Sequence, residues 1–354
     1  MPPPPLTVQY KEANGSRITT DIYLPPAPTT TTTENDTPKK YPVCTSNSFA
    51  ATTIYIKLLK NFTVINIHGG VFMLGHSRMV SMPQVDDCLA RNWIVVVPNH
   101  RLCPQVNMLE GPITDIRDLL AWIYDGQLDA FLAGAGADAA GYRVDMDRVM
   151  AFGTSSGGTL ALSLGYSVPR PVAAILDFYG AVHFTHPFWT QPLPDVQRTL
   201  PPLDPAFLQK IYDEYPVPTD SSISLEGQTE LAGGSKAKGP DFSRPRDAFA
   251  LTQVANGTVL QACYPDGDVR EIDPVVHVGK GFPPTFIVHG DCDTKVSIEV
   301  SRELWRVLRE NGVECGMVEV PGEDHTFAMG MQVGGRTWEL QREGFEFLER
   351  VISR

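Results

Sequence analysis

The sequence predicts an α/β protein with a mostly parallel central sheet, and three observations support this fold class. Short, almost continuously apolar runs, such as FTVINIHGG (62–70) and WIVVVPNH (93–100), are typical of strands buried on both faces of a parallel sheet. Amphipathic segments such as DIRDLLAWIYD (115–125) carry apolar residues at helical spacing. These strands and helices alternate along the chain, which predicts helices on both faces of the sheet.

The first strands are expected to be antiparallel. The segment LTVQYKEANGSRITTDIYLP (6–25) alternates apolar and polar residues on both sides of Asn14-Gly15. This pair tolerates the positive φ angles of a two-residue hairpin turn. Residues 25–40 are rich in Pro and Thr and predict a solvated loop. The chain is therefore expected to begin with an N-terminal hairpin.

The same alternation continues to the end of the sequence, with one interruption. We expect strands at 148–153, 172–180, 284–290 and 315–320 and helices at 115–125, 159–167, 297–311 and 337–352. Residues 181–282 break the pattern, with many prolines and an aromatic cluster, HFTHPFW. Because a structureless loop of this length is rare inside a compact domain, it predicts a cap subdomain. The chain then divides into a core part at 1–180, a cap at 181–282 and a second core part at 283–354.

Composition excludes several classes of protein. The 354 residues carry a net charge of -12, with 42% hydrophobic and 20% charged residues, and no basic stripe that would bind nucleic acid. The start, MPPPPLTVQY, lacks the features of a signal peptide, and no apolar run reaches the length of a membrane span. Six cysteines show neither paired nor zinc-binding spacing. We expect a soluble, cytoplasmic protein with reduced thiols and no metal; self-association into a homo-oligomer is left open.

Two adjacent serines, in VMAFGTSSGGTLAL (149–162), stand between an expected strand and an expected helix. Gly-x-Ser-x-Gly at such a junction is typical of the nucleophile elbow, a tight turn that lifts one serine above the sheet. Only Ser155 has glycine two positions away on both sides, since Thr154 stands where Ser156 would need one. Two helix-capping serines without chemistry are the alternative. The order of strand, glycine pair and helix favours Ser155 as a nucleophile.

A serine nucleophile needs oxyanion donors and a base. The glycines of HGG (68–70) follow an expected strand, where their N–H groups can face the site beside that of Ser156; an ordinary tight turn is the alternative. His325, in VPGEDHTFAMG, is the expected base because it follows a late strand, and His277 and His289 are its rivals.

The serine also needs a carboxylate that orients its base. Asp291 and Asp293, in FIVHGDCDTKV, compete for this role at the end of the strand expected at 284–290. They stand two residues apart on one turn, so both cannot face the imidazole. Each could instead be a capping or turn aspartate. Spacing alone does not separate them.

A series of motifs resembles that of a known family. The motifs NIHGGVFMLGHS, NHRLCPQ, ITDIRDLLAWI, DMDRVMAFGTSSGGTLAL, HGDCDTKV and EDHTF are similar, in this order, to those of α/β-hydrolase esterases related to hormone-sensitive lipase. The C-terminal half is closer to dienelactone hydrolase and prolyl oligopeptidase. The resemblance covers about residues 60–180 and 283–350 and implies the α/β-hydrolase fold.

The resemblance also implies a set of site residues. In relatives the carboxylate of HGxxDxxV is the second aspartate, which matches Asp293 in this sequence. The implied triad is Ser155, Asp293 and His325, and the implied oxyanion donors are the N–H groups of Gly69, Gly70 and Ser156.

The sequence departs from the family pattern at several positions. Val71 replaces the usual third glycine of the oxyanion motif, Thr154 replaces an aspartate and Ser156 replaces an alanine. Residues 44–63 lengthen the approach to the oxyanion strand, as an added surface strand or an error in the gene model such as a retained intron. The family often builds its cap from N-terminal helices, whereas here the insertion at 181–282 is expected to cover the site.

The predicted function is hydrolysis of carboxylic esters of small, mainly apolar molecules through an acyl-enzyme, without metal or cofactor. Val71, Phe72, Phe184, Phe188 and Trp189 are candidates for the substrate pocket, although cap aromatics often form a small core of their own. Alternatives on the same triad are an acyltransferase, a lactone or thioester hydrolase in a biosynthetic pathway, or a peptidase. A non-catalytic small-molecule receptor is a further alternative.

Overall fold

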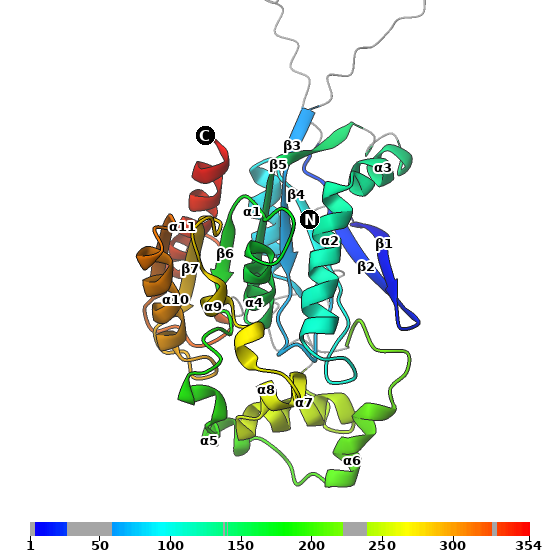
Figure 1. Cartoon of the computed structure of the whole chain (residues 1–354), viewed down its shortest axis with the longest axis vertical. Helices are drawn as coiled ribbons and strands as arrows, with labels where there is room; N and C mark the ends of the chain where they lie inside the picture. The colour runs from blue at the N-terminus through cyan, green and yellow to red at the C-terminus, as the bar shows by residue number, and fades with distance from the viewer. Residues whose placement is uncertain (1–3, 27–58, 137–138, 140, 222–238, 328–330) are drawn as a thin grey trace, which may run out of the picture.

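The computed structural model describes residues 4–26, 59–136, 139, 141–221, 239–327 and 331–354. Within these ranges the core is one eight-stranded sheet in the order β1-β2-β4-β3-β5-β6-β7-β8 (Figure 1). The strands are β1 (Leu6–Ala13), β2 (Ser16–Tyr23), β3 (Leu59–Ile67), β4 (Ile94–Pro98), β5 (Tyr142–Thr154), β6 (Ile175–Phe178), β7 (Thr285–Gly290) and β8 (Cys315–Val320). From β4 to β8 every neighbouring pair is parallel, which confirms the predicted sheet.

The chain opens with the predicted hairpin. β1 and β2 pair antiparallel, and Ala13 lies opposite Ser16 across the turn. Asn14 and Gly15 both have positive φ, 52° and 76°, as a two-residue hairpin turn requires. β2 continues antiparallel onto β4 and so joins the hairpin to the parallel part of the sheet.

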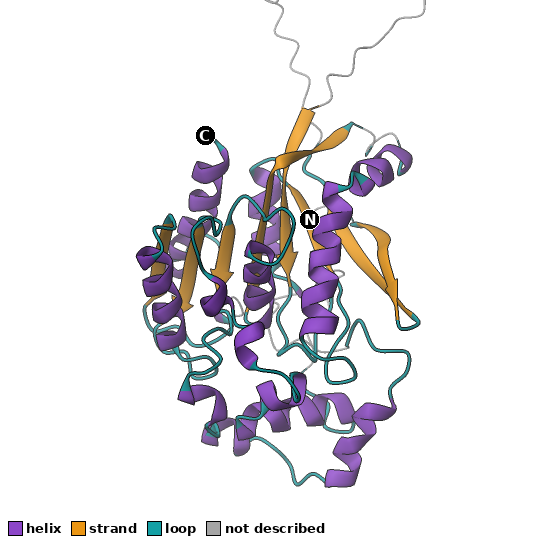
Figure 2. Ribbon diagram, viewed as in Figure 1, coloured by secondary structure: helices purple, strands orange, loops and turns teal. Residues whose placement is uncertain are grey.

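Helices cover both faces of the sheet (Figure 2). Those of the core are α1 (Met82–Ala90), α2 (Thr114–Tyr124), α3 (Gln127–Gly134), α4 (Ser156–Leu162), α10 (Ile298–Glu310) and α11 (Arg336–Ile352). One apolar cluster joins α2, α3, α4 and α10 to the sheet, and a second joins α1 and α11 to its other face. Short 3-10 or π turns occupy Ser77–Met79, Leu109–Ile113, Ser163–Gly165, Pro187–Thr190, Lys210–Asp213 and Val269–Glu271.

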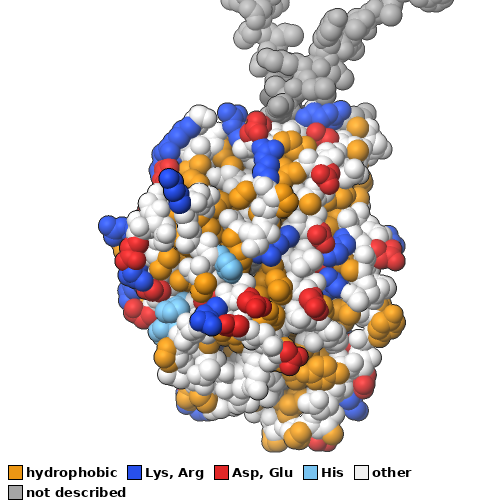
Figure 3. Space-filling view, viewed as in Figure 1, with side chains coloured by type: hydrophobic (Ala, Val, Ile, Leu, Met, Phe, Trp, Pro, Cys, Tyr) orange, Lys and Arg blue, Asp and Glu red, His pale blue; other side chains and the backbone are white. Residues whose placement is uncertain are grey.

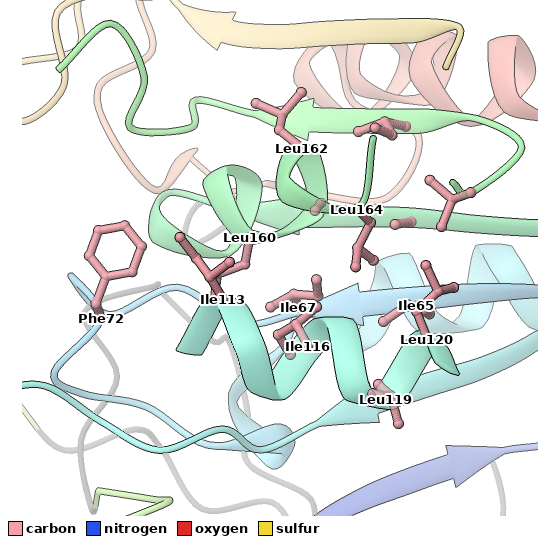
Figure 4. Packing of buried hydrophobic residues seen from close by; sticks show 14 of the residues in the cluster. Ile65, Ile67, Phe72, Ile113, Ile116, Leu119, Leu120, Leu160, Leu162 and Leu164 are labelled. Atoms are coloured by element: carbon pink, nitrogen blue, oxygen red, sulfur yellow. The ribbon is translucent and has the colours of Figure 1, made fainter. Parts of the chain in front are cut away.

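Alternation of side chains along β3 explains its continuous apolar run. Ile65 and Ile67 pack against α2 and α4, close to Ile116 and Leu160 (Figure 4), whereas Val64 belongs to the cluster on the opposite face. Both faces of the strand are therefore buried, so both sets of alternating residues are apolar.

Three expected elements differ clearly in length from the structure. The strand expected at 148–153 is longer and spans Tyr142–Thr154. The helix expected at 159–167 begins earlier, at Ser156, because the glycines that follow Ser155 already form its first turn, and it ends at Leu162. The strand expected at 172–180 is shorter and spans Ile175–Phe178. The loop expected at 25–40 falls mostly outside the described residues. So does most of 44–63, of which only 59–63 are seen, in β3.

The segment 181–282, predicted as a cap, contains five α-helices joined by loops where it is described. Its helices are α5 (Pro194–Gln197), α6 (Pro205–Gln209), α7 (Pro245–Asn256), α8 (Val259–Cys263) and α9 (Pro274–His277). Figure 1 shows α5 to α8 together beyond the end of the sheet at which the parallel strands finish. Arg246 of α7 is buried, and its guanidinium donates to the carbonyl oxygens of Met73 and Cys103 at 2.7 and 2.8 Å. These bonds attach α7 to loops of the core.

Charged side chains of both signs are interspersed with apolar ones on the face shown in Figure 3. Over the residues that the structure describes, no helix is both long and apolar enough to cross a membrane.

The buried carboxyl group of Asp177 predicts that the stability of the fold depends on pH. Asp177 is fully buried in β6, where Gly158 and Gly180 leave room for its carboxyl group. Burial raises its pKa from 3.8 to about 7, and the backbone N–H of Gly180 opposes this rise only in part. The carboxyl group of Asp177 therefore ionises at a lower pH in the unfolded chain than in the folded one. The free energy of unfolding falls as the pH rises from about 4 to about 7. Asp177→Asn cannot ionise and should remove this loss.

The measurement is urea unfolding of both proteins at pH 4 and pH 8. The stability of Asp177→Asn relative to the unmodified protein should increase by up to roughly 4 kcal/mol between these values. The same exchange at the exposed Asp266 is the control. An equal pH dependence in Asp177→Asn and the unmodified protein would contradict the prediction.

Candidate active site

Ser155 lies on a sharp turn between β5 and α4. Its backbone has φ 51° and ψ -123°, a conformation that costs a non-glycine residue free energy and that clusters at functional sites. Two backbone hydrogen bonds hold the turn: Ser155 N donates to Phe178 O at 2.9 Å, and Gly158 N donates to Ser155 O at 2.9 Å. The turn has the strand, serine and helix order of a nucleophile elbow.

The flanking glycines are required by close backbone packing. A Cβ atom on Gly157 would lie 2.1 Å from the carbonyl oxygen of Ile67 in β3, and one on Gly153 would lie 2.2 Å from Gly157 O. Neither position leaves space for a methyl group. The elbow is thus packed tightly against β3, the strand that leads to the expected oxyanion loop.

The structure brings Ser155, His325 and Asp293 together, although they come from three separate parts of the chain. His325 Nε2 lies 3.1 Å from Ser155 Oγ, and His325 Nδ1 lies 2.6 Å from Asp293 Oδ2. Asp293 Oδ1 accepts the backbone N–H groups of Lys295 and Val296, both at 2.8 Å. Hydroxyl, imidazole and carboxylate therefore form one continuous chain of hydrogen bonds.

The alternative candidates for the carboxylate and the base do not contact Ser155. The carboxylate of Asp291 accepts the N–H of Gly322 at 2.6 Å. His277 stacks on Tyr166 with 4.1 Å between ring centroids, and its Nε2 lies 2.8 Å from Glu271 O. His289 is fully buried and contacts Asp293 rather than Ser155.

The contacts of Asp293 determine its charge state. Burial disfavours its ionised form, but the imidazoles of His325 and His289 outweigh this effect and hold the pKa of the carboxyl well below its usual range. Asp293 is therefore a carboxylate at neutral pH. The ring of Tyr179 packs edge to face on His325, with 4.8 Å between centroids.

The expected oxyanion loop follows β3. Gly70 has φ 120°, and a Cβ there would lie 2.2 Å from Leu74 O. Gly70 and Ser156 line the cavity beside Ser155. Gly69 does not line it, and its carbonyl oxygen lies 2.8 Å from His68 Nδ1. Val71 adopts φ 52°, so the residue that replaces the family's third glycine keeps a left-handed backbone.

A cavity of about 410 Å³ opens beside Ser155. Of the residues predicted for a pocket, Val71, Phe72, Phe188 and Trp189 line it. Phe184 does not line this cavity: its side chain is buried, with 5.9 Å between its ring centroid and that of Trp189.

Much of the cavity wall was not predicted from the sequence. The apolar residues contributed by α5, α7 and α8 and their connections are Leu193, Val196, Leu251, Val254, Val259 and Leu260. Their sequence signal is weak because these helices are short and only one side of each faces the cavity. Lys295 and Asp324 add polar groups to the wall near His325.

Within the described ranges, no group of three or more His, Cys, Asp or Glu side chains could hold a metal ion. The described cysteines are all unpaired; Cys88, Cys103 and Cys263 are buried and Cys292 is exposed.

The parallel sheet, the elbow after β5 and the histidine after β8 define the class of protein: the chain has the α/β-hydrolase fold, as its motifs implied.

A family model described as BD-FAE matches residues 59–195. Among solved structures, Thermogutta terrifontis esterase 2 phosphoramylated by tabun has a TM-score of 0.58 at 15% identity, covering 99% of this chain and 96% of that one. A Staphylococcus aureus protein with unknown function has a TM-score of 0.62 at 16% identity, covering 98% and 99%.

The sequence is also similar to much longer proteins. The non-reducing polyketide synthase ausA of Aspergillus calidoustus is 27% identical over 98% of this chain, and that of Penicillium brasilianum is 30% identical over 81%. The chain spans only 14% and 12% of the length of these two relatives.

The glycine packing predicts a large stability difference between two similar exchanges. Gly157→Ala should destabilise the fold by several kcal/mol, because its methyl group overlaps backbone atoms of Ile67 and His68 that cannot move independently of β3. Gly134→Ala, at the end of α3, meets nothing within 4 Å and should be neutral or stabilising by up to about 1 kcal/mol. Urea unfolding compares the two, and equal midpoints would contradict this account of the elbow.

Proposed function

We propose that the chain is a serine hydrolase that cleaves carboxylic esters with small, mainly apolar acyl groups through an acyl-enzyme. The observation that carries this proposal is the hydrogen-bond chain from Ser155 through His325 to Asp293 beside an apolar cavity. A hydroxyl needs such a base to become a nucleophile at neutral pH. The similarity in fold to a structure named as an esterase agrees with this chemistry.

In this mechanism His325 Nε2 takes the proton of Ser155 Oγ as the oxygen attacks the ester carbonyl carbon. The carboxylate of Asp293 accepts the N–H of His325 Nδ1, which keeps Nε2 free to act as the base and stabilises the imidazolium. The imidazolium then protonates the departing alcohol. Water attacks the acyl-enzyme with His325 again as the base, and the acid leaves while Ser155 regains its proton.

The tetrahedral intermediates carry a negative oxygen that needs donors already in place. In the proposed mechanism the N–H groups of Gly70 and Ser156, beside Ser155, supply them, with Gly69 in the same loop. The N–H of Ser156 also belongs to the first turn of α4, where the helix dipole favours negative charge.

The cavity supports the proposed class of substrate. Its volume of about 410 Å³ falls near the lower end for small-molecule sites, and most of its wall is aliphatic or aromatic. Of the charged residues in the wall, Asp195 pairs with Arg198, Asp324 accepts the backbone N–H of Thr294 at 2.7 Å, and the ammonium of Lys295 donates to Thr294 Oγ1 at 2.6 Å. A compact, uncharged acyl group therefore suits the site.

A second candidate is hydrolysis or transfer of an acyl group held as a thioester, with release of a biosynthetic product. It is favoured by the similarity to non-reducing polyketide synthases, which covers 98% of this chain in the Aspergillus calidoustus protein. The same three side chains would carry out this reaction, since a thioester differs from an ester only in its leaving group.

Replacement of Ser155 tests both candidates. Ser155→Ala should lower turnover by roughly three orders of magnitude or more and abolish labelling by a fluorophosphonate probe. Turnover is measured on an oxygen ester and a thioester of the same acyl group, with and without an added alcohol acceptor. Ser353→Ala, at the exposed end of α11, is the control and should behave like the unmodified protein.

The outcomes separate the alternatives. A higher kcat/KM for the thioester than for the ester favours the second candidate, and acyl transfer to the alcohol in preference to water favours an acyltransferase. No labelling of Ser155 in folded protein, together with no turnover of either substrate, would contradict both candidates.

Phe188 tests the proposed acyl pocket. Phe188→Ala removes an aromatic wall of the cavity and should lower kcat/KM for a long or aromatic p-nitrophenyl ester by roughly tenfold, because less apolar surface is buried in the complex. The value for p-nitrophenyl acetate should change much less. Phe207→Ala, in α6 and outside the cavity wall, is the matched control. Equal losses for the long ester and the acetate would exclude an acyl-binding role.

A further inference from the structure

Asp293 contacts two imidazoles instead of one. Its Oδ2 lies 2.6 Å from His325 Nδ1 and 3.1 Å from His289 Nε2. Its Oδ1 accepts the N–H groups of Lys295 and Val296. The imidazole of His289 has no part in the mechanism above. It nevertheless contacts the same carboxylate oxygen as the imidazole of the proposed base, His325.

The surroundings of His289 determine which of its nitrogens carries the proton. Nε2 faces two acceptors, the carboxylate of Asp293 and, at 3.0 Å, the carbonyl oxygen of Val296. Neither can donate, so Nε2 must carry a hydrogen. Nδ1 lies 2.8 Å from Ser301 Oγ in α10, and a neutral imidazole has only one N–H, so the Ser301 hydroxyl donates to Nδ1. His289 and Ser301 are both fully buried.

We propose that His289, held in this tautomer by Ser301, is a positioning residue that fixes the carboxylate of Asp293 for the proposed base, His325. This inference rests on the proposed function, because it assigns His289 a role in that reaction. The hydrogen-bonded order is then Ser301, His289, Asp293, His325 and Ser155, from the interior of α10 to the cavity.

The location of Asp293 shows why such support matters. The turn after β7 is open to solvent, with Asp291, Cys292 and Thr294 exposed. His289 stands on β7 itself and is therefore fixed by the sheet. A hydrogen bond from His289 ties the side chain of a surface turn to the rigid core, and catalytic geometry depends on such supporting contacts.

His289 also affects the charge that His325 meets. A hydrogen bond to Oδ2 disperses part of the negative charge of the carboxylate. Without this donor, Asp293 attracts the protonated form of His325 more strongly. The pH at which the base loses its proton should then rise, together with the acid limb of the pH–rate profile.

Other groups near these imidazoles stay constant in the test. Asp324 accepts the backbone N–H of His325, Lys295 lines the same cavity, and Tyr179 packs against both rings. Glu319 lies opposite His289 on β8. Because the variants leave all four unchanged, a shifted acid limb reports on the contact between His289 and Asp293.

The experiment compares His289→Leu, His289→Gln and Ser301→Ala in the full chain. His289→Leu should lower kcat roughly tenfold or more with little change in KM, and should move the acid limb to higher pH. His289→Gln, whose amide can still donate to Asp293, should recover part of kcat and return the acid limb towards its original position. Ser301→Ala removes only the hydroxyl. It should change kcat and the acid limb in the same direction as His289→Leu, but by less. Arg306→Ala, on the exposed side of α10, is the control.

A spectroscopic signal complements turnover. The proton between His325 Nδ1 and Asp293 should give a far-downfield ¹H resonance, identified by its loss in Asp293→Asn. This resonance should move in His289→Leu and Ser301→Ala and stay in place in Arg306→Ala. It requires no substrate, so it reports on the contact itself.

Two results would overturn the inference while leaving the proposed function intact. One is an unchanged acid limb and resonance in His289→Leu and Ser301→Ala. The other is a loss of activity that only follows the loss of folded protein, measured by circular dichroism. If the unmodified protein neither turns over esters or thioesters nor reacts with a fluorophosphonate, the proposed function fails and this inference fails with it.

Discussion

The close approach of α4 to β3 is the constraint on which the rest of the site depends. Gly157 lies so near the carbonyl oxygen of Ile67 that no side chain fits, and this contact fixes the helix directly above the carboxyl end of the sheet. The chain can make that turn only with Ser155 in a strained, left-handed conformation. The same contact holds the end of β3, from which the loop of Gly70 starts, so the hydroxyl and the expected oxyanion donors share one rigid support.

Other elements of the fold position His325 and Asp293 near the hydroxyl of Ser155. His325 and Asp293 come from turns after β8 and β7, neighbouring parallel strands whose carboxyl ends share an edge of the sheet. Both turns carry exposed residues, but the carboxylate of Asp293 accepts hydrogen bonds from two backbone N–H groups and from two imidazoles. Preorganisation of this kind means that the groups need little rearrangement during reaction.

The sequence predicted the features whose signals are local. The Asn14-Gly15 turn, the apolar runs of the parallel strands and the glycines around Ser155 each reflect a backbone requirement within a few residues. Asp291 and Asp293 could not be separated by spacing, because their difference lies in which imidazole or N–H group each meets after folding. The aromatic residues could not be separated for a similar reason: nothing in HFTHPFW shows that Phe188 and Trp189 line the cavity while Phe184 is buried against Trp189.

The division between core and inserted segment explains how one fold can serve different substrates. The proposed reacting groups follow the carboxyl ends of β5, β7 and β8, whereas the inserted segment supplies much of the apolar wall. Arg246 joins the two, since its guanidinium donates to the carbonyl oxygens of Met73 and Cys103 in the core. The wall is therefore held against the loop of Gly70 by contacts that do not depend on which residues face the substrate. Changes in that wall can alter which group fits the cavity while the elbow and the histidine stay in place, so similarity of fold to an esterase and similarity of sequence to polyketide synthases are compatible in one chain.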